Sequence, residues 1–461
     1  MRSIGEKCGV FGVYGEGLDA SRLTFFGLYA LQHRGQESSG IASADGKKIL
    51  CHKDTGLVSK VFDEEIIAGL TGHIAIGHNR YSTSSGTGAK HAQPIEVEDG
   101  SIVLAHNGNL PNVSKLEKFL KEKKVDTSGM SDSKIVCEAL YVLTKEGLSI
   151  EVAIEKVFPF IHGVFSILII TKDKLIAIRD SFGIRPFSIA KLNGGYVFSS
   201  ETCAFHPIGA TFLRDVLPGE MVVVDKDGLR SKQIVKGTQK LDIFEFVYFS
   251  RPDSVLLGKS VYEVRKEFGV RLAKEYPIEA DVVIPIPETA IPVAIGYANA
   301  SGIPFETGLI KSRYIHRTFI EPEQHIREQG VKLKLAPLRE VIENKRVIVV
   351  DDSIVRGTTS KQIVKMLFDT GAKEVHFLVS SSPVKFPDFY GIDLPRWQDL
   401  LASKKSIPEM NEYLGSTSLN FLSYDGMVSA TGLDESLLCT SCFSGVYPID
   451  VKNAIIREKT G

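Results

Sequence analysis

The chain of 461 residues is 43% hydrophobic and 24% charged, a composition that is typical of a soluble globular protein. Its 55 basic and 56 acidic side chains give no net field that would favour nucleic acid or an anionic membrane as a partner. The apolar runs are too short to cross a bilayer, and six cysteines do not make a disulfide framework, so we expect a cytoplasmic protein.

Short strand-like runs dominate the first half of the chain. They lie at residues 8–15, 73–84, 102–110 and 165–180, between turns rich in glycine, asparagine and serine. Helical patterns intervene at residues 21–34 and 133–147. This mixture indicates stacked sheets with helices packed on them.

The second half alternates strands and helices more regularly. Continuous apolar runs predict strands at residues 280–289, 345–353 and 374–383, and helical patterns follow at residues 290–302 and 358–372. This alternation predicts a parallel sheet covered on both faces. The turn-rich stretch 224–240 marks the expected boundary, with domains at 8–240 and 241–461. From about residue 395 the tail predicts only short helices and loops.

Two adjacent carboxylates, Asp351 and Asp352, end the strand predicted at 345–353. Ligands of a parallel sheet bind at this end of its strands, where carboxylates suit sugar hydroxyls or magnesium. A turn that can accept a phosphate on its backbone amides follows at Gly357, Thr358, Thr359 and Ser360. Phosphoribosyl pyrophosphate carries all of these groups. The alternative is a core strand that ends in a solvated acidic turn.

Two further stretches fit the same ligand. Thr289 ends the strand predicted at 280–289 with a hydroxyl that can reach a metal or pyrophosphate. The stretch 309–330 contains basic and aromatic residues that could close over a leaving pyrophosphate, namely Lys311, Arg313, Tyr314 and Arg317. Such a stretch taken alone is more often a solvated surface.

Cys8 follows a short polar leader and opens a strand. We expect residues 1–7 to be removed, which would let the α-amine of Cys8, titrating at about pH 8, act as the base for its own thiol. Without removal, glutamine-dependent activity should vanish. The alternative is a buried strand cysteine, which is common.

Three other stretches supply partners for this thiol. Arg80 can pair with a carboxylate, and Asp132 can pair with an ammonium group. The Asn107 side-chain amide and the Gly108 backbone N–H suit an oxyanion hole, although the sequence around them could also form only a hairpin turn. Together these groups predict hydrolysis of the glutamine side-chain amide.

The stretch 349–360 resembles the signature of type I phosphoribosyltransferases, and the stretches around Cys8, 31–41, Arg80, Asn107 and Asp132 resemble N-terminal-nucleophile glutamine amidotransferases. In this order they resemble the amidophosphoribosyltransferase family. The resemblance implies an αββα sandwich of the α+β class, followed by a parallel α/β phosphoribosyltransferase domain.

The same resemblance implies a reaction and its partners. Glutamine, water and phosphoribosyl pyrophosphate give 5-phosphoribosylamine, glutamate and pyrophosphate, the committed step of purine synthesis. Thr289, Asp351 and Asp352 match the magnesium positions of the family, and residues 358–360 match its 5-phosphate cradle. A homotetramer or homodimer and feedback inhibition by purine nucleotides are also implied.

The chain departs from the family at one metal site. One branch of the family holds a [4Fe–4S] cluster on four cysteines, of which Cys439 and Cys442 remain, while Asp242 and Asp388 stand at the other two positions. Such clusters prefer four thiolates, whereas zinc accepts sulfur and carboxylate together. Three alternatives stay open: a lost metal, zinc, or a cluster with aspartate ligands.

Two competing functions share parts of this pattern. A hexosamine-phosphate synthase would share the first half, but the stretch 349–360 argues against it. A sensor that binds phosphoribosyl pyrophosphate without catalysis is opposed by the intact set around Cys8.

Overall fold

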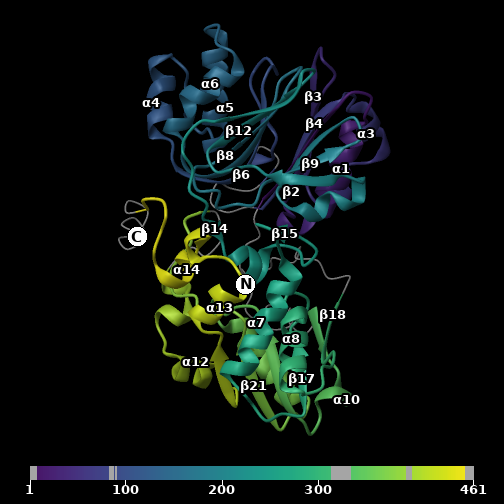
Figure 1. The fold of residues 1–461 in the computed structure, drawn as a ribbon, viewed down its shortest axis with the longest axis vertical. Coiled ribbons are helices and arrows are strands. Elements are labelled where there is room, and N and C mark those ends of the chain that lie inside the picture. The colour runs from purple at the N-terminus through teal and green to yellow at the C-terminus, as the bar shows by residue number, and fades with distance from the viewer. Residues whose placement is uncertain (1–7, 82–87, 89–90, 313–333, 391–396, 452–461) are drawn as a thin grey trace.

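The computed structural model describes residues 8–81, 88, 91–312, 334–390 and 397–451. They form two lobes stacked along the long axis of the molecule (Figure 1). The upper lobe contains two sheets and the lower lobe contains a smaller parallel sheet. Short elements from the start and from the end of the second half of the chain lie between the lobes.

The first sheet of the upper lobe has seven strands. Where the strands pair, they run antiparallel. Their spatial order is β11 (Thr211–Asp215), β9 (Ser188–Leu192), β10 (Gly195–Ser199), β1 (Gly9–Gly15), β4 (Ile74–Arg80), β2 (Ser38–Ala44) and β3 (Ile49–Thr55).

The second sheet of the upper lobe has six antiparallel strands. Their spatial order is β13 (Gly228–Gln233), β12 (Glu220–Asp225), β8 (Leu175–Arg179), β7 (His162–Ile170), β6 (Val103–Asn112) and β5 (Ile95–Glu96).

Side chains alternate along strand β1 between two cores. Val10 and Tyr14 join the core between the sheets, whereas Phe11 and Val13 face the helices. The helices on this outer face are α1 (Ala20–Ala30), α2 (Val58–Val61) and α3 (Glu64–Gly69). On the far face of the second sheet lie α4 (Ser114–Glu122), α5 (Asp132–Lys145) and α6 (Ile150–Val157). The layers are therefore helix, sheet, sheet and helix, and the αββα prediction is confirmed.

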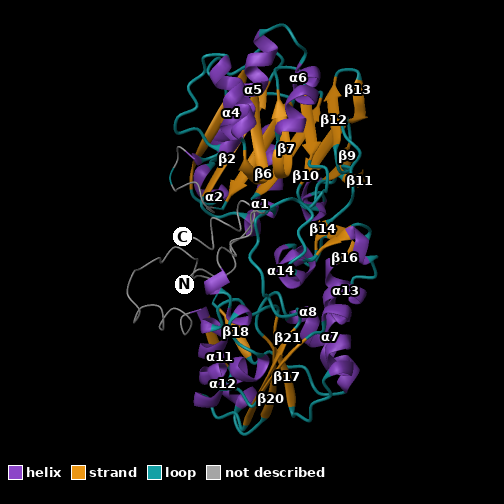
Figure 2. Ribbon diagram, turned by 90° about the vertical axis from the view of Figure 1, so that its left-hand side faces the viewer, coloured by secondary structure: helices purple, strands orange, loops and turns teal. Residues whose placement is uncertain are grey.

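The lower lobe is a parallel sheet with helices on both faces (Figure 2). Its strands, in spatial order, are β17 (Val282–Pro285), β20 (Arg346–Asp351), β21 (Glu374–Val379) and β22 (Ser418–Phe421). One face packs on α7 (Val261–Glu275) and α8 (Ile291–Ser301), and the other on α11 (Thr358–Asp369) and α12 (Ile407–Leu414). Strand β22 corrects the prediction for the tail after about residue 395, where only short helices and loops were expected.

The remaining strands are short, as are the helices η6, α10, α13 and α14. Near the junction of the lobes lie η6 (Glu245–Phe249), α14 (Ser441–Ser444), α13 (Tyr424–Ala430), and the pairs β14 (Leu241–Asp242) with β23 (Leu438–Cys439) and β15 (Val255–Leu256) with β16 (Lys259–Ser260). The lower lobe also contains α10 (Arg339–Ile342) and the pair β18 (Leu309–Lys311) with β19 (Leu335–Pro337). Within the described residues, no helix is both long and apolar enough to span a membrane.

Candidate functional site

Strand pairing brings Cys8 next to Arg80. Strands β1 and β4 are antiparallel with Gly9 opposite Asn79, so the residue before β1 stands beside the last residue of β4. The Cys8 thiol lies 3.8 Å from the carbonyl oxygen of Tyr81. Arg80 is buried, and its guanidinium lies 2.8 Å from a carboxylate oxygen of Glu37. A thiol and a carboxylate-binding cation therefore share one end of the first sheet.

Asn107 and Gly108 lie within strand β6 of the facing sheet, so the hairpin-turn alternative is wrong. The Asn107 side-chain amide donates to the Ser200 hydroxyl at 3.2 Å, and this oxygen also accepts from the Val10 backbone N–H at 3.0 Å. Ser200 thus joins the predicted oxyanion donor to the strand that follows Cys8. The sequence alone gave no signal for it.

Glycine is required at position 108 for two reasons. Its φ of 153° lies in a region that L side chains rarely adopt. A Cβ atom there would also lie 1.9 Å from the carbonyl oxygen of Val164. The backbone of β6 can therefore approach its neighbour closely only without a side chain at this point.

Asp132 begins helix α5 and lies against the same strand. One carboxylate oxygen accepts from the Leu110 backbone N–H at 3.3 Å, and the other accepts from the Ser133 N–H at 2.7 Å. Asp132 is partly exposed. Its charge is therefore close to Gly108 and remains available to a ligand.

Arg34 follows α1 and is one of the least exposed side chains in the described structure. Its Nε donates to the backbone carbonyl of Cys8 at 3.2 Å, and its other nitrogens donate to Glu201 and, at 3.2 Å, to both oxygens of Glu245. Burial alone lowers the pKa of Arg34, but the charges of Glu245 and Glu201 outweigh it and raise the pKa. The backbone carbonyl of Cys8 is thus bound to a permanent cation.

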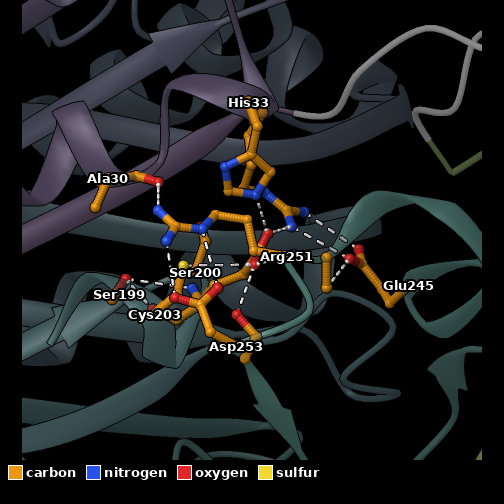
Figure 3. A network of polar contacts seen from close by, with 12 residues as sticks. Ala30, His33, Ser199, Ser200, Cys203, Glu245, Arg251 and Asp253 are labelled. Carbon is orange, nitrogen blue, oxygen red and sulfur yellow. Dashed lines mark hydrogen bonds and ion pairs between the residues drawn. The ribbon is translucent and has the colours of Figure 1, made fainter. Parts of the chain in front are cut away.

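Glu201 accepts hydrogen bonds from residues of both lobes, among them His33 and Arg251, which are labelled in Figure 3. It accepts from the His33 ring at 2.8 Å, from the Arg251 backbone N–H at 2.9 Å and from the Ser254 hydroxyl at 2.8 Å. The Arg251 side chain in turn donates to the Ala30 carbonyl at 3.0 Å. This buried network, which sequence reasoning missed, joins the segment after α1 to the start of the lower lobe.

The Cys8 thiol is not activated by its surroundings alone. Burial raises its pKa above the ordinary value, and the nearby charges of Arg80 and Arg34 offset only part of that rise. The thiol therefore needs a base if it is to react near neutral pH. Burial also lowers the pKa of His106, which precedes Asn107.

The second group of predicted residues lies at the carboxyl end of the parallel sheet. Asp351 is the last residue of β20, and Asp352 follows it. Burial and then the neighbouring charge of Asp352 raise the pKa of Asp351 well above its ordinary value. Burial raises the pKa of Asp352 to about 6, although Ser353 and Arg265 lower it in part. Two adjacent carboxylates in this state suit a divalent cation or hydroxyl donors.

Helix α11 begins just beyond these carboxylates, at Thr358, Thr359 and Ser360. Gly357 precedes it with a φ of 74°, and a Cβ atom there would lie 2.5 Å from the Leu401 side chain. The first amides of a 12-residue helix therefore face the region beyond the sheet and can bind an anion.

Two of the remaining predicted residues of this group, Thr289 and Lys311, lie in or beside the loop after β17. The Ile286 N–H donates to the Val350 carbonyl at 2.8 Å, so this loop, which contains Thr289, starts beside Asp351. Lys311 is exposed at the end of β18, with its Nζ 3.4 Å from Glu288. Arg313, Tyr314 and Arg317 lie outside the described residues.

The position of the second predicted metal site contains an arginine. The buried Arg185 guanidinium lies 2.9 Å from Asp242 and 3.9 Å from Asp388. Cys439 pairs with Asp242 across the β14–β23 ladder, and burial followed by the charge of Asp242 raises its pKa to about 12. Across the part of the chain that the structure describes, no three His, Cys, Asp or Glu side chains form a group that could hold a metal. The residues present fit an ion pair better than a cluster.

The raised pKa of Asp352 predicts a pH dependence of stability. The folded state binds this proton more tightly than the unfolded state, so in magnesium-free buffer the free energy of unfolding should fall as the pH rises from 3.8 to about 6. Asp352→Asn should remove the part of this loss that comes from Asp352, leaving the variant on the order of 1–3 kcal/mol more stable than wild type above that range, while the part that comes from Asp351 remains. Unfolding in urea at several pH values tests this. If the free energy of unfolding depended on pH in the same way in both proteins, the prediction would be wrong.

Comparisons with known proteins agree with this arrangement. A family model described as a glutamine amidotransferase domain matches residues 78–207, and one described as a phosphoribosyl transferase domain matches residues 259–383. An amidophosphoribosyltransferase from Synechococcus elongatus is 46% identical, covering 98% of this chain and 94% of its own. One from Bacillus subtilis is 42% identical, covering 98% and 96%.

Solved structures give the same result. A glutamine phosphoribosylpyrophosphate amidotransferase from B. subtilis, complexed with ADP and GMP, superimposes with a TM-score of 0.89 at 42% identity. The match covers 96% of this chain and 98% of that one. The chain therefore belongs to the amidophosphoribosyltransferase family, whose members use glutamine and phosphoribosyl pyrophosphate to make 5-phosphoribosylamine in purine biosynthesis.

Proposed function

We propose that this chain carries out the family reaction with Cys8 as the nucleophile that releases ammonia from glutamine. The observation that carries this proposal is the convergence of two sheets on one thiol. The β1–β4 register sets Arg80 beside Cys8, and the Ser200 hydroxyl ties Asn107 of the facing sheet to β1.

In this proposal Arg80 binds the glutamine α-carboxylate and Asp132 binds its α-ammonium group. The Cys8 thiolate attacks the side-chain amide, and the Asn107 amide and the Gly108 N–H stabilise the oxyanion. Ammonia leaves as the C–N bond breaks, and water then hydrolyses the glutamyl thioester to glutamate. The raised pKa of the Cys8 thiol is consistent with a dedicated base.

That base is the α-amine of Cys8, which requires removal of residues 1–7. We propose a glutaminase domain over 8–240 and a phosphoribosyltransferase domain over 241–461. The sandwich strands end at Gln233 and the parallel sheet begins at Val282, which supports this division.

The lower lobe then takes phosphoribosyl pyrophosphate. Asp351 and Asp352 hold the ribose hydroxyls and, with Thr289, a magnesium ion, while the amides at 358–360 bind the 5-phosphate. Magnesium, when bound, would neutralise charge on the pyrophosphate. The basic stretch that contains Lys311, with Arg313, Tyr314 and Arg317, would serve the leaving pyrophosphate.

The broader properties of the protein are part of the proposal too. Because one relative was solved with ADP and GMP, we propose purine nucleotides as feedback inhibitors of this chain. A homotetramer or homodimer in the cytoplasm is the proposed state. The second predicted metal site comprises Asp242, Asp388, Cys439 and Cys442. In place of a metal there, we propose that Arg185 pairs with the two aspartates.

Replacing the nucleophile separates the two half-reactions. Cys8→Ala should abolish glutamine-dependent synthesis of phosphoribosylamine and leave ammonia-dependent synthesis intact, because the lower lobe is unchanged. Pyrophosphate release with each nitrogen donor measures this. Cys51→Ala, at the other half-buried thiol, is the control and should use glutamine normally. Equal loss of both activities in Cys8→Ala would contradict the two-site proposal.

Ser200→Ala should lower kcat for glutamine by about tenfold or more, because Asn107 loses the acceptor that orients its amide. Ammonia-dependent activity should not change. The matched control is Ser166→Ala, since Ser166 pairs with Asn107 across the β6–β7 ladder but its hydroxyl has no hydrogen-bond partner among the described residues. Similar losses in both variants would show that packing, not the amide, is responsible.

Metal analysis tests the ion-pair assignment. Protein purified without oxygen should contain far less than one iron or zinc per chain and show no visible absorption from a cluster, because a guanidinium already pairs with both carboxylates. Iron or zinc at one equivalent that disappears in a Cys439→Ser, Cys442→Ser double variant would contradict it.

A further inference from the structure

The guanidinium proposed to bind glutamine already holds a carboxylate of the chain itself. Arg80 Nη1 lies 2.8 Å from Glu37 Oε1, and both side chains are largely buried. Glu37 stands between the short helix η1 (Gln32–Arg34) and strand β2. Sequence reasoning assigned it no role.

The backbone of Glu37 cannot move away from Arg80. Its N–H donates to the Arg80 carbonyl at 3.0 Å, and its carbonyl accepts from the Gly56 N–H at 2.7 Å. At Gly35, a Cβ atom would lie 2.7 Å from the Arg80 carbonyl carbon, so these two segments are in close contact. The ion pair can therefore open only by rotation of one of its two side chains, since the two backbones are held together.

This ion pair is incomplete. Glu37 Oε2 is buried and has no hydrogen-bond partner among the described residues. A buried carboxylate oxygen without a donor is unfavourable, whereas a guanidinium can bind both oxygens of one carboxylate. A ligand carboxylate that satisfies both of its oxygens would therefore compete well for Arg80.

We infer that Glu37 is an internal counter-ion that the α-carboxylate of glutamine displaces from Arg80, so that Glu37 sets the affinity for glutamine. This inference rests on the proposed role of Arg80. Without substrate, Glu37 places a negative charge beside the buried guanidinium of Arg80. With substrate, one carboxylate replaces another and the charge balance of the site is kept.

Glu37 also acts on the nucleophile. Its negative charge contributes to the raised pKa of the Cys8 thiol, after the larger effect of burial. Neutralising Glu37 should therefore lower the pH at which the thiol ionises. This second effect can be measured without glutamine.

The test is Glu37→Gln in the full chain, freed of residues 1–7 and saturated with phosphoribosyl pyrophosphate. The introduced amide keeps the size of the side chain but carries no charge, so KM for glutamine should fall by about threefold to tenfold with a smaller change in kcat. Glu64→Gln is the control, because it removes one charge from the exposed Glu64–Arg22 pair far from the thiol, and its KM should equal that of wild type.

A KM that rises or stays the same in Glu37→Gln would overturn the inference, since Glu37 would then align Arg80 or not compete at all. Arg80→Gln separates this failure from failure of the proposed function. If Arg80→Gln raises KM, only the Glu37 inference fails; if it leaves KM unchanged, both fail.

Alkylation of Cys8 provides a readout that does not depend on turnover. Iodoacetamide labelling, followed on the Cys8 peptide by mass spectrometry, should reach half its maximal rate at a lower pH in Glu37→Gln than in wild type. An unchanged midpoint in a variant that melts like wild type would overturn the link between Glu37 and the thiol.

Discussion

The structure depends on one buried cation, Arg34. Its guanidinium holds the carbonyl of Cys8 and is neutralised by Glu201 of the upper lobe and Glu245 of the η6 segment. Removing one member of a buried ion pair leaves an uncompensated charge, which costs about 3–5 kcal/mol. The start of β1, the residues after β10 and the η6 segment therefore all contact one side chain.

One short segment lies between the two proposed sites. Glu245 at its start pairs with Arg34, and the Phe246 and Ser250 carbonyls accept from the buried Arg265 on α7, each at 2.8 Å. The charge of Arg265 also lowers the pKa of Asp352. Arg34 thus links the backbone of Cys8 to this segment, and Arg265, whose charge acts on Asp352, binds the same segment.

Local patterns in the sequence were enough for much of this description. Alternation and apolar runs predicted the strands on which Arg80 and Asp351 lie. The guanidinium and the carboxylate at the ends of these strands could therefore be singled out from the sequence. Strand β22 was missed because four residues in a loop-rich tail carry too little pattern to distinguish a strand. Ser200 and Glu37 were missed for another reason: their partners are decided by how distant strands pair, which no local pattern records.

The parallel pair β14–β23 joins residues at the junction of the lobes to residues near the other end of the chain. The ladder pairs Leu241 with Leu438 and Asp242 with Cys439, and the Asp242 N–H also donates to the Ile184 carbonyl of the upper lobe at 3.1 Å. During synthesis on the ribosome, the contacts of Glu245, Arg251 and Ser254 with the upper lobe can therefore form long before this ladder does. The β14–β23 ladder is a late contact, because it requires residues 438 and 439 to have emerged.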